Sequence, residues 1–115
     1  MKLIVAIIQP TKLKAVQEAL ASVGVERMTV CDAQGCARQR GQTEFYRGVE
    51  YKSHLLRKVT LEITVNDDFL ARTVDVITTV ARTGPDGNIG DGKIFVLPCE
   101  EAVAIGGDLR GPEAV

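Results

Sequence analysis

The sequence contains no tryptophan, a single histidine, three cysteines and no marked excess of charge of either sign. Fourteen Lys and Arg residues stand against 15 Asp and Glu residues, so the formal net charge is −1. This balance argues against a general nucleic-acid-binding protein, because proteins that contact many phosphates usually carry a clear basic excess. The hydrophobic share of 45% in 115 residues argues against a disordered chain and fits one compact domain.

Metal-ligating and nucleophilic groups are also scarce. The cysteines at positions 31, 36 and 99 form no Cys-x-x-Cys pair, and together with His54 they do not supply the ligands of a zinc site. We therefore expect Cys31, Cys36 and Cys99 to be buried, reduced thiols of a cytosolic protein. No nucleophile motif accompanies His54, so we expect a polar loop residue there rather than a general base.

Residues 3–8 form a run of six apolar residues near the N-terminus. A run of this length is too short for a signal-peptide core and far too short to span a bilayer. The sequence therefore predicts a cytoplasmic protein.

Apolar periodicity predicts four strands and two helices. Strands are expected at residues 3–8, 27–37, 59–65 and 93–97, and helices at residues 11–23 and 67–83. Thr11 is expected to cap the first helix and residues 66–68 the second. The order β-α-β-β-α-β is that of the split βαβ, or ferredoxin-like, arrangement of the α+β class. We expect a single domain that covers residues 1–115.

The first and last expected strands are apolar at every position, not only at alternate ones. In a ferredoxin-like fold both helices cover the same face of the sheet, whereas a strand without alternation needs both faces buried. We therefore expect another copy of the chain to cover the open face. The alternative is a locally apolar surface.

Residues 38–57 show no steady period and are interpreted as a long loop. The charged and aromatic residues of this stretch and its flank are Arg38, Arg40, Arg47, Lys52, Arg57, Lys58, Glu44, Glu50, Phe45, Tyr46 and Tyr51. A loop of this length usually has a function, here the attraction of anions or docking on a protein. The alternative is a solvated, mobile hairpin extension.

A second loop, residues 83–93, contains four glycines in eleven residues. Glycines allow backbone N–H groups to turn toward an anion, and Lys93 can add a positive charge. The segment is not a P-loop, because no Ser or Thr follows Lys93 and a strand comes next. A β-turn connection explains the pattern equally well.

Several stretches closely resemble the PII signal-transduction proteins of nitrogen metabolism. They are Met1–Ile4 with Pro10, Gly35 with residues 38–41, residues 44–51 (EFYRGVEY) and residues 90–96 (GDGKIFV). The likeness covers residues 1 to about 101, apart from the glycine-rich loop. It implies a homotrimer of ferredoxin-like subunits whose sheets face inward, with ATP or ADP bound in the clefts between subunits.

The resemblance also implies site residues. Positions that match nucleotide contacts are Thr29, Ala37, Arg38, Thr64, Gly90, Asp91, Gly92 and Lys93. Positions that match contacts with 2-oxoglutarate and Mg²⁺ are Gln39, Arg40, Gly41 and Lys58, with the Gln39 amide oxygen as the Mg²⁺ ligand. The long loop corresponds to the family's T-loop, about residues 38–56, which inserts into target proteins. Tyr51 matches the tyrosine that is uridylylated in some members.

The sequence departs from the family pattern in three places. The glycine-rich nucleotide loop, residues 84–93, is longer than usual, and residues 52–57 (KSHLLR) make the base of the T-loop unusually basic. In the short tail, residues 102–115, Ala104 and Gly106 stand where the family shows an Arg-x-Arg pair that reaches the nucleotide phosphates. This loss predicts weaker ATP binding, less preference for ATP over ADP or AMP, and a poor response to 2-oxoglutarate.

We therefore expect a PII-like regulator that senses adenine nucleotides and controls a transporter, a metabolic enzyme or a regulator of nitrogen or carbon metabolism. We expect no turnover enzyme beyond weak ATP hydrolysis, no nucleic-acid partner and no direct insertion into a membrane. One alternative is a small trimeric ferredoxin-like enzyme with its active site at the subunit cleft. Another is a PII-like protein that has lost nucleotide sensing, and a third is a structural or metal-tolerance trimer of related fold.

Overall fold

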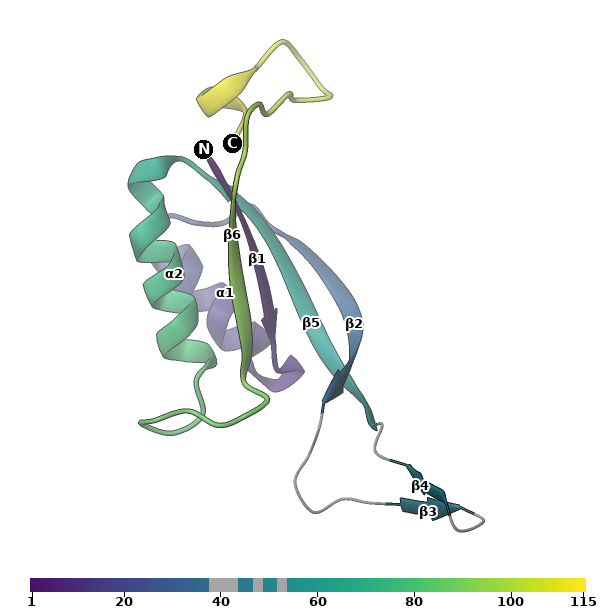
Figure 1. Ribbon diagram of the computed structural model, residues 1–115. Helices are drawn as coiled ribbons and strands as arrows, with labels where there is room; N and C mark the ends of the chain where they lie inside the picture. The colour runs from purple at the N-terminus through teal and green to yellow at the C-terminus, as the bar shows by residue number, and fades with distance from the viewer. Residues whose placement is uncertain (38–43, 47–48, 52–53) are drawn as a thin grey trace.

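The computed structural model describes the backbone of residues 1–37, 44–46, 49–51 and 54–115, and the side chains of residues 1–35 and 56–115 (Figure 1). The strands are β1 (Lys2–Ile8), β2 (Thr29–Ala37), β3 (Glu44–Tyr46), β4 (Val49–Tyr51), β5 (His54–Val65) and β6 (Gly92–Pro98). The helices are α1 (Leu13–Ser22) and α2 (Asp67–Ala81), with 3-10 turns η1 (Pro10–Lys12) and η2 (Gly111–Ala114).

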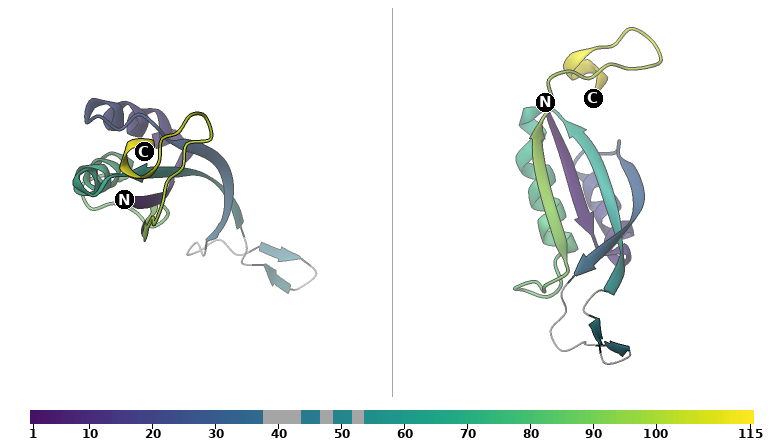
Figure 2. Two further views of the ribbon diagram at one scale, coloured as in Figure 1. Left: turned by 90° about the horizontal axis from the view of Figure 1, so that it is seen from above. Right: turned by 45° about the vertical axis from the view of Figure 1, so that its right-hand side comes forward.

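The main sheet has four strands in the order β2-β5-β1-β6, and every neighbouring pair is antiparallel. Both helices lie on one face of this sheet, as the views in Figures 1 and 2 agree. Strand β1 lies in the middle, where it pairs with β5 on one side and with β6 on the other. The order and the one-sided helices confirm the expected ferredoxin-like arrangement.

The core lies between the sheet and the two helices. Alternate residues of β5, from Val59 to Val65, are buried, as their apolar alternation predicts. They meet Ile4, Ala6 and Ile8 of β1, and Leu20 and Ile77 from the helices fill the space above. Each large aliphatic side chain buried in this way contributes about 1.5–3 kcal/mol relative to an exposed one.

The helix starts differ from the sequence-based expectation. Thr11 caps no helix: the chain first forms η1 at Pro10, and the residue before α1 is Lys12, whose side chain makes no capping hydrogen bond. A proline fits the first turn because its fixed φ and missing N–H cost nothing there. Asn66 precedes α2 as expected, but its amide donates to the carbonyl of Pro112 at 3.2 Å instead of capping.

The long loop is shorter than the sequence predicted, because β5 begins at His54 rather than at residue 59. Residues 54–57 pair with residues 34–37 of β2, which begins at Thr29 instead of residue 27. Short strands β3 and β4 also pair with each other within the expected loop. The expected ends of the long loop at residue 57 and of the T-loop at about residue 56 are therefore wrong, because both residues belong to β5. Of the T-loop, residues 38–43, 47–48 and 52–53 lie outside the described residues.

The sheet face opposite the helices exposes apolar side chains. Leu3, Val5 and Ile7 of β1 are half-buried, whereas Phe95 and Leu97 of β6 are 48% and 43% exposed. This arrangement confirms that the strand pattern leaves apolar surface on the open face. Contiguous apolar surface of this kind is typical of a face that packs against another protein surface.

Two further expectations concern cysteine and membrane association. Cys31 is exposed, so the prediction of a buried thiol is wrong at this position; the side chain of Cys36 lies outside the described residues. Cys99 is partly exposed. Within residues 1–37, 44–46, 49–51 and 54–115, no helix has the length and hydropathy that crossing a membrane requires.

Candidate functional site

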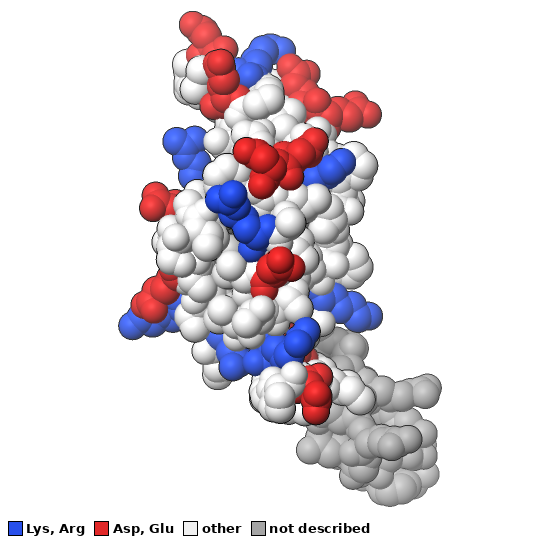
Figure 3. Space-filling model, turned by 90° about the vertical axis from the view of Figure 1, so that its left-hand side faces the viewer, with Lys and Arg blue, Asp and Glu red and all other residues white. Residues whose placement is uncertain are grey.

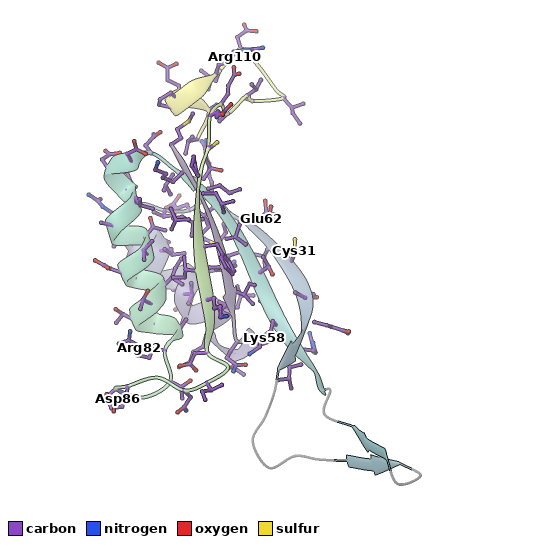
Figure 4. All side chains as sticks on the ribbon, in the orientation of Figure 1. Cys31, Lys58, Glu62, Arg82, Asp86 and Arg110 are labelled. Atoms are coloured by element: carbon purple, nitrogen blue, oxygen red, sulfur yellow. The ribbon has the colours of Figure 1, made fainter. Side chains whose placement is uncertain are left out.

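The expected nucleotide-contact residues that the structure describes divide between two ends of the sheet. One end, where the glycine-rich loop enters β6, holds Ala37, Gly90, Asp91, Gly92 and Lys93, together with Lys58. The other end, from which the tail leaves β6, holds Thr29, Thr64, Ala104 and Gly106. We call these the loop end and the tail end. Figure 4 places Lys58, Arg82 and Asp86 at the loop end and Arg110 at the tail end.

The separation of the two ends follows from the strand register. Lys93 pairs with Ile7 of β1, whereas Thr64 pairs with Leu3. Four residues along a strand span roughly 13 Å, and the length of β6 separates the glycine-rich loop from the tail by roughly 20 Å. Within one chain, Lys93 and positions 104 and 106 therefore do not line a common pocket.

The glycine-rich loop is shaped by the carboxylate of Asp91. This carboxylate accepts hydrogen bonds from the Thr83 backbone N–H at 2.9 Å, the Thr83 hydroxyl at 2.6 Å and the Asn88 N–H at 2.8 Å. Hydrogen bonds from the Thr83 side chain and from the two backbone N–H groups favour the charged form, and they lower the pKa of Asp91 to about 2. Asp91 therefore closes the loop on itself and remains ionised at neutral pH.

Glycine is required where the loop meets the sheet. A Cβ on Gly92 would lie 1.7 Å from the carbonyl oxygen of Ile7, and the residue has a φ of +121°. Gly90 also lies in the left-handed region, with a φ of +102°. Only glycine allows the backbone to adopt these angles and to approach β1 so closely.

The carbonyl of Gly90 joins the loop to the sheet. It accepts hydrogen bonds from Nζ of Lys58 in β5 and from Nε2 of Gln9, which directly follows β1, the latter at 2.8 Å. The resemblance singled out Lys58 and Gly90, but nothing in the sequence identified Gln9. A lone glutamine after a strand has no periodicity or motif that signals its contact with a residue 81 positions away.

Two lysines at the loop end share the open face. Val59 and Ile8 point into the core, so strand alternation puts Lys58 and Lys93, which pairs with Ile7, on the opposite face. Gly90 lies beside Lys58. This part of the sheet therefore combines two cations with a glycine-rich backbone, which is chemistry suited to an anionic ligand.

A cleft of about 600 Å³ lies on the other side of β6, between the glycine-rich loop and the last turns of α2. Its volume falls within the range of about 300–1,000 Å³ typical of ligand pockets. Asp91 and Gly92 line it together with Arg82, a cation that no sequence motif identified. Figure 3 shows acidic and basic side chains interspersed over the face on which α2 lies.

The tail carries no cation at positions 104 and 106. It folds back on itself: the Ala104 N–H donates to the Leu109 carbonyl at 3.0 Å, and Val103 forms a β-bridge with Arg110. Arg110, the tail's remaining cation, lies 2.9 Å from a carboxylate oxygen of Glu101 in an exposed ion pair. Such pairs contribute little to stability, so Arg110 can leave Glu101 at small cost.

Several expected site residues cannot be located on this framework. Residues 38–41, which include Arg38 and the expected ligands Gln39, Arg40 and Gly41, lie outside the described residues. Tyr51 is the last residue of β4, opposite Glu44, and its side chain is likewise outside them.

Comparisons with known proteins identify the family of this chain. The profile of the family described as "Nitrogen regulatory protein P-II" matches residues 1–108. The chain is 45% identical over 115 residues to the nitrogen regulatory protein GlnK1 of Methanosarcina mazei, covering 100% of this chain and 97% of that protein. It is 47% identical to a nitrogen regulatory protein P-II of Azospirillum brasilense over the whole of both chains.

The chain is also 50% identical over 105 residues to nitrogen regulatory protein P-II 1 of Escherichia coli, covering 91% of each chain. The family and these relatives are described as regulatory proteins. The resemblance seen in the opening strand, in residues 44–51 and in residues 90–96 is thereby confirmed along the chain. The chain belongs to the nitrogen regulatory protein P-II family.

Proposed function

We propose that this P-II protein senses adenine nucleotides in clefts between the subunits of a homotrimer and passes their binding state to a target protein through its T-loop. The observation that carries the proposal is the division of the expected contacts between the loop end and the tail end. One chain cannot bring both ends to one nucleotide, whereas two neighbouring chains can. A ring in which the loop end of each subunit meets the tail end of the next supplies equivalent sites.

The loop end is suited to the phosphates. Lys58 and Lys93 supply positive charge, and the glycine-rich backbone near Gly90 and Gly92 supplies N–H groups without obstruction by a Cβ. Charge-assisted hydrogen bonds of this kind are shorter and stronger than neutral ones. The loop end therefore favours an anion, and the phosphates of ATP, ADP or AMP fit it.

The tail end is suited to the base and the sugar. The open face there carries the hydroxyl-bearing Thr29 and Thr64, with Glu62 directly opposite Thr29. Hydroxyl and carboxylate groups can accept from an exocyclic amine, and a hydroxyl can also donate to a ring nitrogen. These strand residues supply no cation; the cations that would reach the phosphates from the tail end are the two arginines that Ala104 and Gly106 replace.

The exposed apolar side chains of the open face support the homotrimer. Phe95 and Leu97 of β6 and the half-buried residues of β1 form a surface whose burial against other copies is favourable. Packing of the subunits also forms the clefts between them. Nucleotide binding therefore depends on formation of the trimer.

The missing arginines set the ligand preference. With Ala104 and Gly106 in place of two arginines, the outer phosphates lose two cationic contacts. ATP is weakened more than ADP or AMP, because ATP has the most phosphate charge to neutralise. Mg²⁺ and 2-oxoglutarate, for which Gln39, Arg40, Gly41 and Lys58 are the proposed contacts, bind weakly as a result. ATP hydrolysis, where it occurs, is slow and incidental.

The T-loop is the proposed output. It docks on a transporter, a metabolic enzyme or a regulator in the cytoplasm, and Tyr51 is a site where a nucleotidyl group can be attached. The six positive charges that the sequence places in and beside this loop favour an acidic docking surface.

Calorimetric titration with ATP, ADP and AMP, each with and without 2-oxoglutarate, tests the proposal. Saturable binding to a protein that sediments at the mass of three subunits is the expected result. Consumption of a metabolite in the same mixtures would instead favour the trimeric enzyme. A stable trimer that binds no nucleotide would favour a P-II protein that has lost nucleotide sensing.

A further inference from the structure

The carbonyl oxygen of Gly90 is shared by two donors that come from different strands. Gln9 reaches it from the end of β1, and Lys58 reaches it from β5 (Figure 4 shows Lys58 at this end of the sheet). A carbonyl oxygen has two lone pairs, so both hydrogen bonds can form at the same time. Both contacts are partly buried, so water competes for them less than it does at the surface.

These two hydrogen bonds tie the glycine-rich loop to the sheet. Among the described residues, the other side-chain hydrogen bonds of the loop are internal: Thr83 and Asn88 donate to Asp91. The internal bonds fix the shape of the loop but not its position. Apart from the pairing of β6 with β1, which begins at Gly92, the Gly90 carbonyl is therefore the point at which side-chain hydrogen bonds hold the loop to the sheet.

The two donors differ in what else they can bind. The Lys58 ammonium carries a full charge, whereas the Gly90 carbonyl offers only a dipole, so a carboxylate or phosphate group nearby binds Lys58 more strongly than that carbonyl does. Gln9 is neutral and gains much less from an anion. An arriving anion therefore competes for Lys58 and leaves the bond from Gln9 in place.

We propose that Gln9 is a positioning residue of the site: it holds the Gly90 carbonyl so that Lys58 can transfer to an anionic ligand while the glycine-rich loop stays in register with the sheet. This inference rests on the proposed function for the identity of the ligand, a phosphate or dicarboxylate anion. The hydrogen-bonding role itself requires no ligand. The loop then remains ordered for the rest of the nucleotide while Lys58 changes partner.

Amide hydrogen exchange of residues 84–92 in the ligand-free protein tests this role. The variants are Gln9→Met, Lys58→Met and the double variant, each of which keeps an unbranched side chain but removes the donor. Because either donor alone satisfies the carbonyl, each single variant should exchange within about threefold of the wild type. The double variant leaves a partly buried acceptor unpaired and should exchange at least about tenfold faster.

Matched controls come from the exposed face of α1. Gln17→Met and Lys14→Met remove the same chemical groups at exposed positions, and their double variant should leave loop exchange unchanged. Unchanged exchange of β1 amides verifies that each variant is folded. If Gln9→Met with Lys58→Met does not fold, Gln9→Asn with Lys58→Met replaces it, since the shorter amide cannot reach Gly90.

Two results would overturn the inference. One is a double variant whose loop amides exchange no faster than those of Lys58→Met alone, because the hydrogen bond from Gln9 then does not hold the loop. The other is a Gln9→Met variant whose loop amides exchange as fast as those of the double variant, because Lys58 then does not share the Gly90 carbonyl.

Calorimetry with ATP separates this inference from the proposed function. Gln9→Met should bind ATP about 2- to 10-fold more weakly than the wild type, the equivalent of one lost hydrogen bond, and Gln17→Met should bind it equally well. Equal affinity of Gln9→Met and the wild type would contradict the role of Gln9 in the site. A wild type that binds no nucleotide would refute the proposed function, while the exchange comparison would still decide whether Gln9 positions the loop.

Discussion

Restoring arginine at positions 104 and 106 should strengthen ATP binding more than AMP binding. Gly106 tolerates the change, because its φ lies outside the left-handed region and a Cβ there would meet no atom within 4 Å. Ala104 contributes its backbone N–H to the bond with Leu109, which any side chain preserves. The double substitution should therefore leave the tail intact.

The magnitude follows from the contacts that two arginines can add. A hydrogen bond to a charged group contributes about 1.5–3 kcal/mol, so two contribute about 3–6 kcal/mol, or roughly a hundred- to ten-thousand-fold in affinity. Solvent around the exposed position 106 places the expected gain at the lower end of that range. The gain for AMP should be much smaller, since AMP lacks the outer phosphates.

Calorimetry on the wild type, the double arginine variant and a charge-matched control measures this effect. The control, Ala15→Arg with Gln17→Arg, adds the same two charges at exposed positions of α1. An equal gain in the control would assign the effect to net charge rather than to the site. A wild type that already binds ATP at low-micromolar affinity (about −8 kcal/mol), with no gain in the arginine variant, would refute the reasoning.

Three further predictions concern the framework of the site. Gly92→Ala should lower the thermal midpoint sharply or prevent folding, because its Cβ would overlap the Ile7 carbonyl, whereas Gly107→Ala, which also has a positive φ but open space around it, should cost only about 1 kcal/mol. Ile77→Ala should lower the free energy of unfolding by about 2–5 kcal/mol in urea titrations, since the side chain is 1% exposed. The pKa of Asp91 is about 2 in the folded protein, which is below its value in the unfolded chain. The contribution of Asp91 to stability should therefore be present above pH 4 and should disappear as the pH falls toward 2. A carboxyl group that titrates near pH 4 by NMR would show that the hydrogen bonds from Thr83 and Asn88 are absent in solution.

The parts of the fold that touch the core could be predicted from the sequence. The alternation of residues 59–65 and the apolar run of β1 follow directly from burial on the helix face, and the structure confirms both. Residues 54–57 (HLLR) escaped prediction because their sequence shows no alternation of apolar and polar residues, and their pairing with residues 34–37 of β2 arises only in the folded chain. Strands of three residues such as β3 and β4 are likewise too short to show a period.

The site could be predicted only where a recognisable stretch carried it. Residues 90–96 and Lys58 came from the family resemblance, and the structure brings Lys58 to Gly90. Gln9 was missed because its one hydrogen bond to Gly90 forms only in the folded chain, and Arg82 because the fold brings it to the cleft beside the glycine-rich loop. No local sequence pattern encodes either placement. Thr11 was wrongly assigned as a cap since the chain forms η1 at Pro10 before α1 begins.

Subunit complementation tests most directly the claim that a nucleotide binds between neighbouring subunits. Lys93→Ala damages the loop end of every subunit, and Thr29→Val with Thr64→Val damages the tail end, so each variant alone should bind ATP poorly. In mixed trimers formed by refolding equal amounts together, a cleft is intact when an undamaged loop end meets an undamaged tail end, which random assembly gives in about a quarter of clefts. Calorimetry should therefore recover about a quarter of the wild-type binding capacity in the mixture. Binding in the mixture no greater than the average of the two separate variants would contradict a site shared between subunits.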